Sequence, residues 1–158
     1  MNIIYIHQYF NTRKGSSGTR SYEFSKYLIS RGHRVTIITG ISDLSDIKSK
    51  KLIRQRSIQG INVIALNITY SNYMPFIRRI IAFLSFAALA TISGLFMKNP
   101  DIIFATSTPL TAGIPGLIIS KLKKTPFIFE IRDLWPEAPI QLGVLTNNII
   151  IRFSNKPL

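Results

Sequence analysis

The chain has 158 residues, of which 46% are apolar, and this is enough for one folded domain with a hydrophobic core. It contains no cysteine, which excludes disulfide bonds and cysteine-ligated metal sites. Its 20 lysine and arginine residues outnumber 7 acidic residues and give a net charge of +13. This charge favours anionic partners such as phosphorylated substrates, anionic lipid or nucleic acid. A solvated basic surface explains the same excess of basic residues.

The basic residues are dispersed but form two clusters, IKSKKLIRQR at 47–56 and the pair Arg78 and Arg79 directly before an apolar run. The first residues, MNIIYIHQYF, lack the basic start and the small-residue cleavage site of a signal peptide. We therefore expect a chain that lies in the cytosol or on a surface facing the cytosol.

Short apolar runs bounded by turn residues alternate with helical patterns along the chain. In chain order the expected elements are strand 3–7, helix 19–32 with Gly32 as its cap, strands 34–40 and 60–66, an apolar helix at about 75–98, strand 101–107, a helical crossover at 109–124 interrupted by Gly113, Pro115 and Gly116, and strand 126–133. This alternation predicts an α/β fold with a Rossmann-like parallel sheet and helices on both faces.

In such a sheet, ligands bind at the loops that follow the carboxyl ends of the strands. These loops are expected at 7–20, 40–46, 106–113 and 132–143. Polar and conformationally special residues gather in them: His7, Gly15, Gly18, Thr19, Arg20, Ser107, Thr108, Glu130, Arg132, Asp133 and Glu137.

The loop after the first strand contains GSSGTR at 15–20, directly before a helix. Its glycine spacing matches neither the dinucleotide fingerprint nor a Walker loop. Glycines nevertheless let a backbone approach a ligand, free N–H groups at a helix start attract anions, and Arg20 offers a forked donor for phosphate. A polar turn whose serine or threonine caps the helix remains the alternative.

The turn EIRDLWPE at 130–137 ends the last predicted strand, where a carboxylate such as Asp133 is well placed for chemistry. Pairing with Arg132 or Glu130 would set its charge state. The alternative is an internal Arg–Asp pair that closes the strand, with Trp135 packing the turn.

The segments IHQYF, GTRSYEFSKYLISRGHRVTIITG and FEIRDLWPEAPIQLGVL resemble the N-terminal, acceptor-side domain of retaining GT-B glycosyltransferases of the family 4-like type. Among these, RDLWPE together with HQYF and GTR is most similar to the colanic-acid and O-antigen branch, including the fucosamine transferases. The resemblance spans nearly the whole chain and implies that residues 1–158 form this one domain, with a membrane-associating helix at about 75–98 within it. It implies a cytoplasmic enzyme, peripheral or monotopic at the inner face of the plasma membrane, that passes a sugar from a nucleotide-sugar to a lipid-linked acceptor in surface polysaccharide or lipopolysaccharide synthesis.

The resemblance also implies roles for individual residues. Gly18, Thr19 and Arg20 are expected near the donor diphosphate, and Asp133 beside the reacting sugar, where it orients or polarises the acceptor hydroxyl. The remaining expected substrate contacts are His7 and Arg132, Trp135 stacked on a sugar ring, and Glu137 on a sugar hydroxyl. No cofactor is implied, and two distant histidines without cysteine give no case for a metal site.

The apolar run IIAFLSFAALATISGLFM at 80–97 has 18 uncharged residues, which is the lower limit for spanning a bilayer. It is compatible with a core helix, with a helix lying in the membrane interface, and with a spanning helix. A spanning helix would divide one sheet across the membrane, so it ranks last. An interfacial helix would bring the basic clusters onto anionic headgroups.

GT-B enzymes hold the nucleotide-sugar in a second domain with paired glutamates, and no such donor site is evident in this sequence. We therefore expect a truncated transferase that is inactive unless a separate chain supplies the second domain. A non-catalytic, membrane-associated module that binds lipid-linked glycan is the main alternative. A nucleic-acid binder is not expected because the aromatic residues fall mostly within apolar stripes, and a dinucleotide oxidoreductase is not expected because G-x-G-x-x-G is missing.

Overall fold

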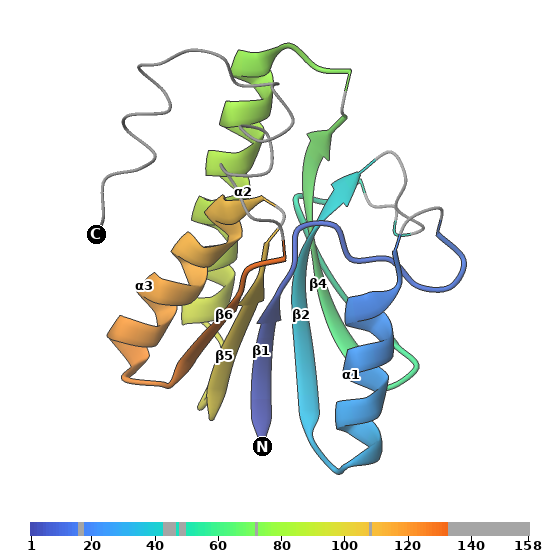
Figure 1. Cartoon of the computed structure of the whole chain (residues 1–158), viewed down its shortest axis with the longest axis vertical. Coiled ribbons are helices and arrows are strands. Elements are labelled where there is room, and N and C mark those ends of the chain that lie inside the picture. Colours follow the sequence, from blue (N-terminus) through green and yellow to red (C-terminus); the bar gives the residue numbers. More distant parts are fainter. Residues whose placement is uncertain (16–17, 43–46, 48–49, 72, 108, 133–158) are drawn as a thin grey trace.

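The computed structural model describes residues 1–15, 18–42, 47, 50–71, 73–107 and 109–132. These residues form a six-stranded sheet in the order β3-β4-β2-β1-β5-β6, with helices on both of its faces (Figure 1). In chain order the elements are β1 (Asn2–Ile6), α1 (Arg20–Ser30), β2 (Arg34–Ser42), β3 (Ile53–Ile58), β4 (Ile61–Tyr70), α2 (Phe76–Leu95), β5 (Ile102–Thr106), the 3-10 turn η1 (Leu110–Ala112), α3 (Gly113–Lys123) and β6 (Phe127–Glu130). The expected Rossmann-like α/β class is confirmed.

The sheet is mixed, because β3 pairs antiparallel with β4 while the other pairings are parallel. The expectation of a parallel sheet was wrong at this edge, where the sequence was interpreted only as a basic cluster. The hairpin between β3 and β4 turns at Gln59 and Gly60, with φ values of 48° and 87°. Two successive positive φ angles are typical of a type I′ hairpin turn, and glycine adopts the second without strain.

The order of the strands reverses between β1 and β5. From β1 the chain moves through α1 to β2 and on to β4, and it then returns through α2 to β5 on the other side of β1. Right-handed crossovers therefore place α1 on one face and both α2 and α3 on the other, as Figure 1 shows. The connections that follow β1 and β5 lead to opposite faces of the sheet at this point, and open α/β sheets bind ligands there.

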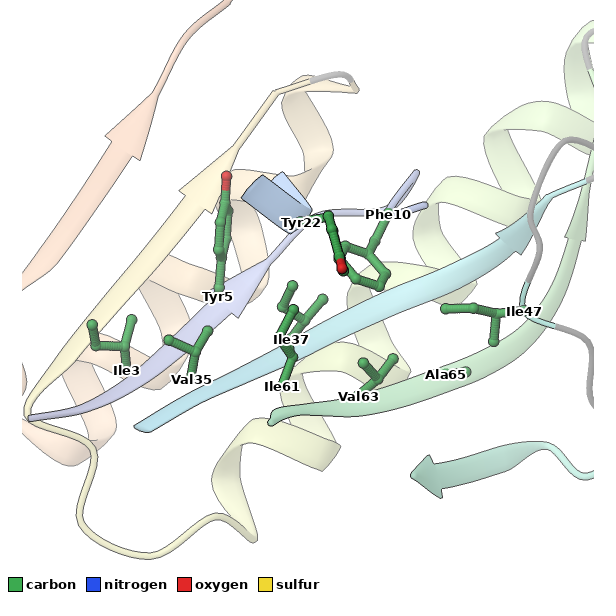
Figure 2. Close-up of a cluster of buried hydrophobic side chains, with 10 residues drawn as sticks. All are labelled: Ile3, Tyr5, Phe10, Tyr22, Val35, Ile37, Ile47, Ile61, Val63 and Ala65. Atoms are coloured by element: carbon green, nitrogen blue, oxygen red, sulfur yellow. The ribbon is translucent and has the colours of Figure 1, made fainter. Parts of the chain in front are cut away.

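Alternate side chains of each central strand enter two separate cores. On the α1 face, Ile3 and Tyr5 of β1 join Tyr22 of α1 and apolar residues of β2 and β4 (Figure 2). On the other face, Ile4 and Ile6 of the same strand pack with side chains of α2 and α3. This division explains why the strands are almost continuously apolar, since both faces of a covered parallel sheet are buried.

Helix α3 is continuous, although an interruption by glycine and proline was expected in this segment. Pro115 stands in its first turn, where the missing N–H would have no partner in the helix. Gly116 is required by packing, because a Cβ atom there would lie 2.4 Å from the ring of Phe127. The glycines thus let the helix approach β6 closely.

Candidate active site

The loops after β1 and β5 begin with His7 and Ser107, both of them buried. The His7 N–H donates to the Ile38 carbonyl at 3.0 Å, and the Ser107 N–H donates to the Glu130 carbonyl at 2.9 Å. These bonds extend the ladders of the sheet by one residue beyond the strands. Two of the loop residues singled out from the sequence therefore sit, rigidly held, at the point where the strand order reverses.

The His7 side chain lies on the α1 face, under the first turn of α1. Its Nδ1 atom is 2.7 Å from the Ser21 hydroxyl, and the residue as a whole is 4% exposed. Burial, together with the smaller effect of the positive charge of Arg132, lowers the pKa of the imidazole to about 4. His7 is therefore neutral at physiological pH, and its uncharged ring is suited to hydrogen bonding.

Acid is expected to destabilise the protein through His7. The unfolded histidine takes up a proton near its ordinary pKa of 6.5, whereas the folded one resists protonation until about pH 4. The stabilisation is complete above pH 6.5, and up to about 3 kcal/mol is lost as the pH falls to 4. Urea unfolding across this range should show a slope that His7→Gln reduces and His33→Gln does not; equal slopes in both variants would contradict the assignment.

A second polar group joins the start of α1 to the carboxyl end of the edge strand β6. Arg20 forms an ion pair with Glu130, whose other carboxylate oxygen accepts a hydrogen bond from the Thr106 hydroxyl at 2.7 Å. The Arg20 side chain is 62% exposed and that of Glu130 is 22% exposed. Arg20 was expected to offer its guanidinium to a phosphate, and a phosphate bound there would share that group with Glu130 or displace it.

The two glycines of the loop 15–20 lie in different surroundings. A Cβ atom on Gly15 would lie 2.6 Å from Asn11 Oδ1, whereas one on Gly18 would meet no atom within 4 Å. Packing among the described residues thus explains the first glycine but not the second. Thr19 precedes α1 and accepts the Glu23 N–H through its carbonyl at 2.9 Å, but its side chain makes no capping hydrogen bond.

The turn after β6 is described only as far as Arg132. The backbone N–H of Arg132 donates to the Ser107 hydroxyl at 2.8 Å, which ties this turn to the loop after β5. Arg132 is thereby brought to the same edge of the sheet as His7. Asp133, Trp135 and Glu137 lie outside the described residues, and their assigned roles remain predictions.

A pocket of about 330 Å³ opens beside these groups, on the α1 face of the sheet. The rings of Tyr5, Phe24 and Phe104 line it, and the Arg20–Glu130 pair stands at its polar side. Burial and the negative charge of Glu130 raise the pKa of the Tyr5 hydroxyl, so Tyr5 stays protonated. Within the described part of the chain, no group of three or more metal-binding side chains occurs.

The residues that the sequence did not single out are Ser21 and Thr106. Ser21 is the second residue of α1, and Thr106 pairs in register with Glu130 across β5 and β6. Thr106 could have been found by pairing the two predicted strands, because paired residues of neighbouring strands share a face of the sheet. No local pattern distinguishes Ser21 from the other serines of α1.

Helix α2 is long and apolar enough, by length and composition alone, to cross a membrane. Its 18-residue window has a mean hydropathy of 1.7 and is 28% buried within the protein. A core helix of a soluble protein satisfies the same test. In this structure one side of the helix, with Ala82, Phe86, Ala90 and Gly94, packs on the sheet and α3.

Comparison with solved structures identifies similar folds at low sequence identity. The C-terminal domain of a hydrogenase from Pyrococcus furiosus matches with a TM-score of 0.58 at 13% identity, over 82% of this chain and 90% of that one. A structure described as trehalose-6-phosphate from E. coli bound with UDP-2-fluoro glucose matches with a TM-score of 0.53 at 9% identity, over 82% of this chain and 32% of that one. Both show the fold alone.

No curated protein matches the chain significantly. The family model for the glycosyl transferase 4-like domain matches residues 15–150, which is most of the sequence. The match includes the glycine loop, α1, and the sequence segment that contains Arg132 and Asp133. The chain therefore belongs to the glycosyl transferase 4-like domain family.

Proposed function

We propose that this chain is the acceptor-side domain of a retaining glycosyltransferase that moves a sugar from a nucleotide-sugar to a lipid-linked acceptor in surface polysaccharide synthesis, of the O-antigen or colanic-acid type. The observation that carries the proposal is the family match over 15–150, in a chain whose His7 and Ser107 loops meet at the reversal point of the sheet. A glycosyltransferase binds both a nucleotide-sugar and an acceptor. The finer assignment rests on the resemblance of RDLWPE, HQYF and GTR to that branch.

In this proposal each candidate residue has its own role in binding or reaction. Gly18, Thr19 and Arg20 face the donor diphosphate, and an open position at Gly18 supports a close backbone approach. Asp133 orients the acceptor hydroxyl beside the reacting sugar. His7, Arg132, Trp135 and Glu137 contact the substrates.

The donor sugar is held by a second domain, on the same or a separate chain, and residues 1–158 do not transfer sugar without it. This part of the proposal rests on the two-domain architecture of GT-B enzymes. It predicts transfer only when the donor domain is supplied with this one. Transfer by residues 1–158 alone would contradict it.

The assignment of Asp133 is tested in the assembled transferase with nucleotide-sugars and a membrane fraction as acceptor source. Asp133→Asn is expected to lower kcat by at least about 100-fold, because it removes a charge from beside the acceptor hydroxyl. Asp101→Asn is the matched control. Asp101 accepts the Asn2 N–H at 2.6 Å at the opposite, amino-terminal edge of the sheet, so its loss should leave kcat near that of the wild type. Unchanged turnover in Asp133→Asn would end the assignment.

The second part of the proposal is attachment to the inner face of the plasma membrane through α2. Its outward side exposes large apolar residues, among them Phe76 at 69%, Ile77 at 70% and Ile81 at 57%. Contiguous apolar surface of this kind marks an interaction site on a soluble protein. Arg78 lies exposed between these residues and suits an anionic headgroup.

The first basic cluster lies at the same end of the sheet. The Asn67 N–H donates to the Leu52 carbonyl at 2.8 Å, which places Lys50, Lys51 and Leu52 beside the carboxyl end of β4. Helix α2 starts six residues after β4 ends, and its first turns lie beyond the ends of β1 and β5 (Figure 1). Apolar and basic groups therefore gather at the edge that carries the candidate site, which supports an acceptor delivered from a lipid surface.

The exposed side of α2 equally favours the alternative function, a non-catalytic module that binds lipid-linked glycan at the membrane. The two functions differ in one result. Sugar transfer by the assembled protein supports the transferase. Binding of lipid-linked glycan without transfer, under the same conditions and with a donor domain present, supports the module.

A further inference from the structure

The structure places His7 Nδ1 and the Ser21 hydroxyl within hydrogen-bond distance, and the direction of the bond between them depends on the tautomer of the imidazole. Ser21 is 1% exposed, and among the described residues the partner of its hydroxyl oxygen is His7 Nδ1, at 2.7 Å. The Ser25 hydroxyl donates to the Ser21 carbonyl at 2.6 Å, a contact that does not involve the Ser21 side chain. Among the described residues, the Ser21 hydroxyl is therefore available to His7 alone.

A neutral imidazole carries one proton, on either Nδ1 or Nε2. If Nδ1 carried it, Nδ1 would donate to Ser21 Oγ, and the Ser21 hydroxyl hydrogen would be left buried without an acceptor. Burying a donor without a partner is costly, whereas donation from Ser21 to Nδ1 satisfies both groups. The buried pair is therefore satisfied only with the proton on Nε2.

The surroundings of His7 support a neutral ring in this arrangement. Tyr5 precedes it on the same face of β1, with ring centroids 6.4 Å apart, and Arg132 contributes a positive charge from the turn after β6. Neither group accepts a proton from the imidazole. His7 thus lies at the reversal point as an uncharged ring with its proton on Nε2.

We propose that Ser21 is a positioning residue, which holds His7 in the Nε2–H tautomer so that His7 donates a hydrogen bond to a substrate oxygen and does not act as a base. The substrate oxygen belongs to a sugar hydroxyl or to a phosphate, both of which accept such a bond. This inference rests on the proposed function for the identity of the substrate. The state of the ring itself does not depend on catalysis and is measured separately.

The test is a long-range proton–nitrogen NMR correlation on the ¹⁵N-labelled full chain at neutral pH. The chain has 2 histidines, so His33 provides an internal reference in the same spectrum. We expect His7 to have a protonated Nε2 and an unprotonated Nδ1. Ser21→Ala should lower the ratio of Nε2–H to Nδ1–H tautomers by about tenfold, because the hydroxyl donor is lost.

Two further variants separate positioning from general structural damage. Ser21→Thr retains the hydroxyl and should restore the wild-type ratio. Ser25→Ala removes an equally buried serine from the next turn and should leave the ratio unchanged. A proton on Nδ1 of His7 in the wild-type chain, or an unaltered ratio in Ser21→Ala, would overturn the proposal, and the wild-type spectrum decides even if a variant fails to fold. Absence of sugar transfer in the assembled protein would instead refute the proposed function and leave the tautomer result intact.

Discussion

Replacing Phe86 with alanine is expected to lower the free energy of unfolding by about 3–5 kcal/mol. Phe86 is fully buried on the side of α2 that faces the sheet. Its ring lies 3.6 Å from the position that a Cβ atom on Gly40 of β2 would take, so it fills the space directly over the central strands. Removing the ring leaves a cavity there that neighbouring side chains cannot close without moving the helix.

Phe76→Ala is the matched control for this substitution. It makes the same chemical change on the same helix, at a residue that is 69% exposed. Surface substitutions usually change stability by less than about 0.5 kcal/mol. Chemical denaturation followed by circular dichroism should therefore separate the two variants clearly; similar midpoints would mean that α2 does not pack on the sheet as described.

The comparison also separates a helix that packs on the sheet from a helix that spans the membrane. A core helix places its large side chains against the sheet, and an interfacial helix adds a second apolar side that faces lipid. The spacing of Ala82, Phe86, Ala90 and Gly94, four residues apart, gives α2 one buried stripe. The exposed apolar residues follow a second stripe, which explains why composition alone left the alternatives open.

The sequence predicted most of the elements because each depends on local patterns. The apolar runs located β1, β2, β4, β5 and β6 to within a few residues, and Gly32 adopts a left-handed conformation with φ of 82° just after α1, as a helix cap requires. β3 was missed because its residues are mostly exposed, with basic side chains along the edge of the sheet. Charged edge strands protect a sheet from pairing with other chains, but they remove the apolar signal on which strand prediction relies.

The sequence predicted which loops follow the carboxyl ends of the strands, but not the contacts that the residues of those loops make. The loops follow from the alternation of strands and helices, so His7, Arg20 and Arg132 were expected at one edge. The ion pair of Arg20 with Glu130 spans 110 positions of sequence, and the bond from Thr106 to Glu130 depends on the register of two strands. Such contacts follow from the topology of the sheet, which no local pattern of residues specifies.

Replacing Phe76, Ile77 and Ile81 together with serine is expected to weaken binding to anionic vesicles by more than about 100-fold. Each buried side chain of this size contributes roughly 1.5–3 kcal/mol on transfer from water, and all three are more than half exposed in the protein. Stability should change little, since these side chains contribute little to the core. Vesicle sedimentation with and without anionic lipid measures the effect.

The control is Tyr27→Ser, which removes an apolar ring that is 54% exposed on α1, across the sheet from α2. Its vesicle affinity should equal that of the wild type. Replacing Lys50 and Arg78 with glutamine should weaken binding only when anionic lipid is present, by about 1 kcal/mol for each charge at low salt, because headgroup attraction is screened by ions. Wild-type affinity in the triple serine variant would remove α2 as the attachment surface, and with it the reason for placing the acceptor site at a lipid surface.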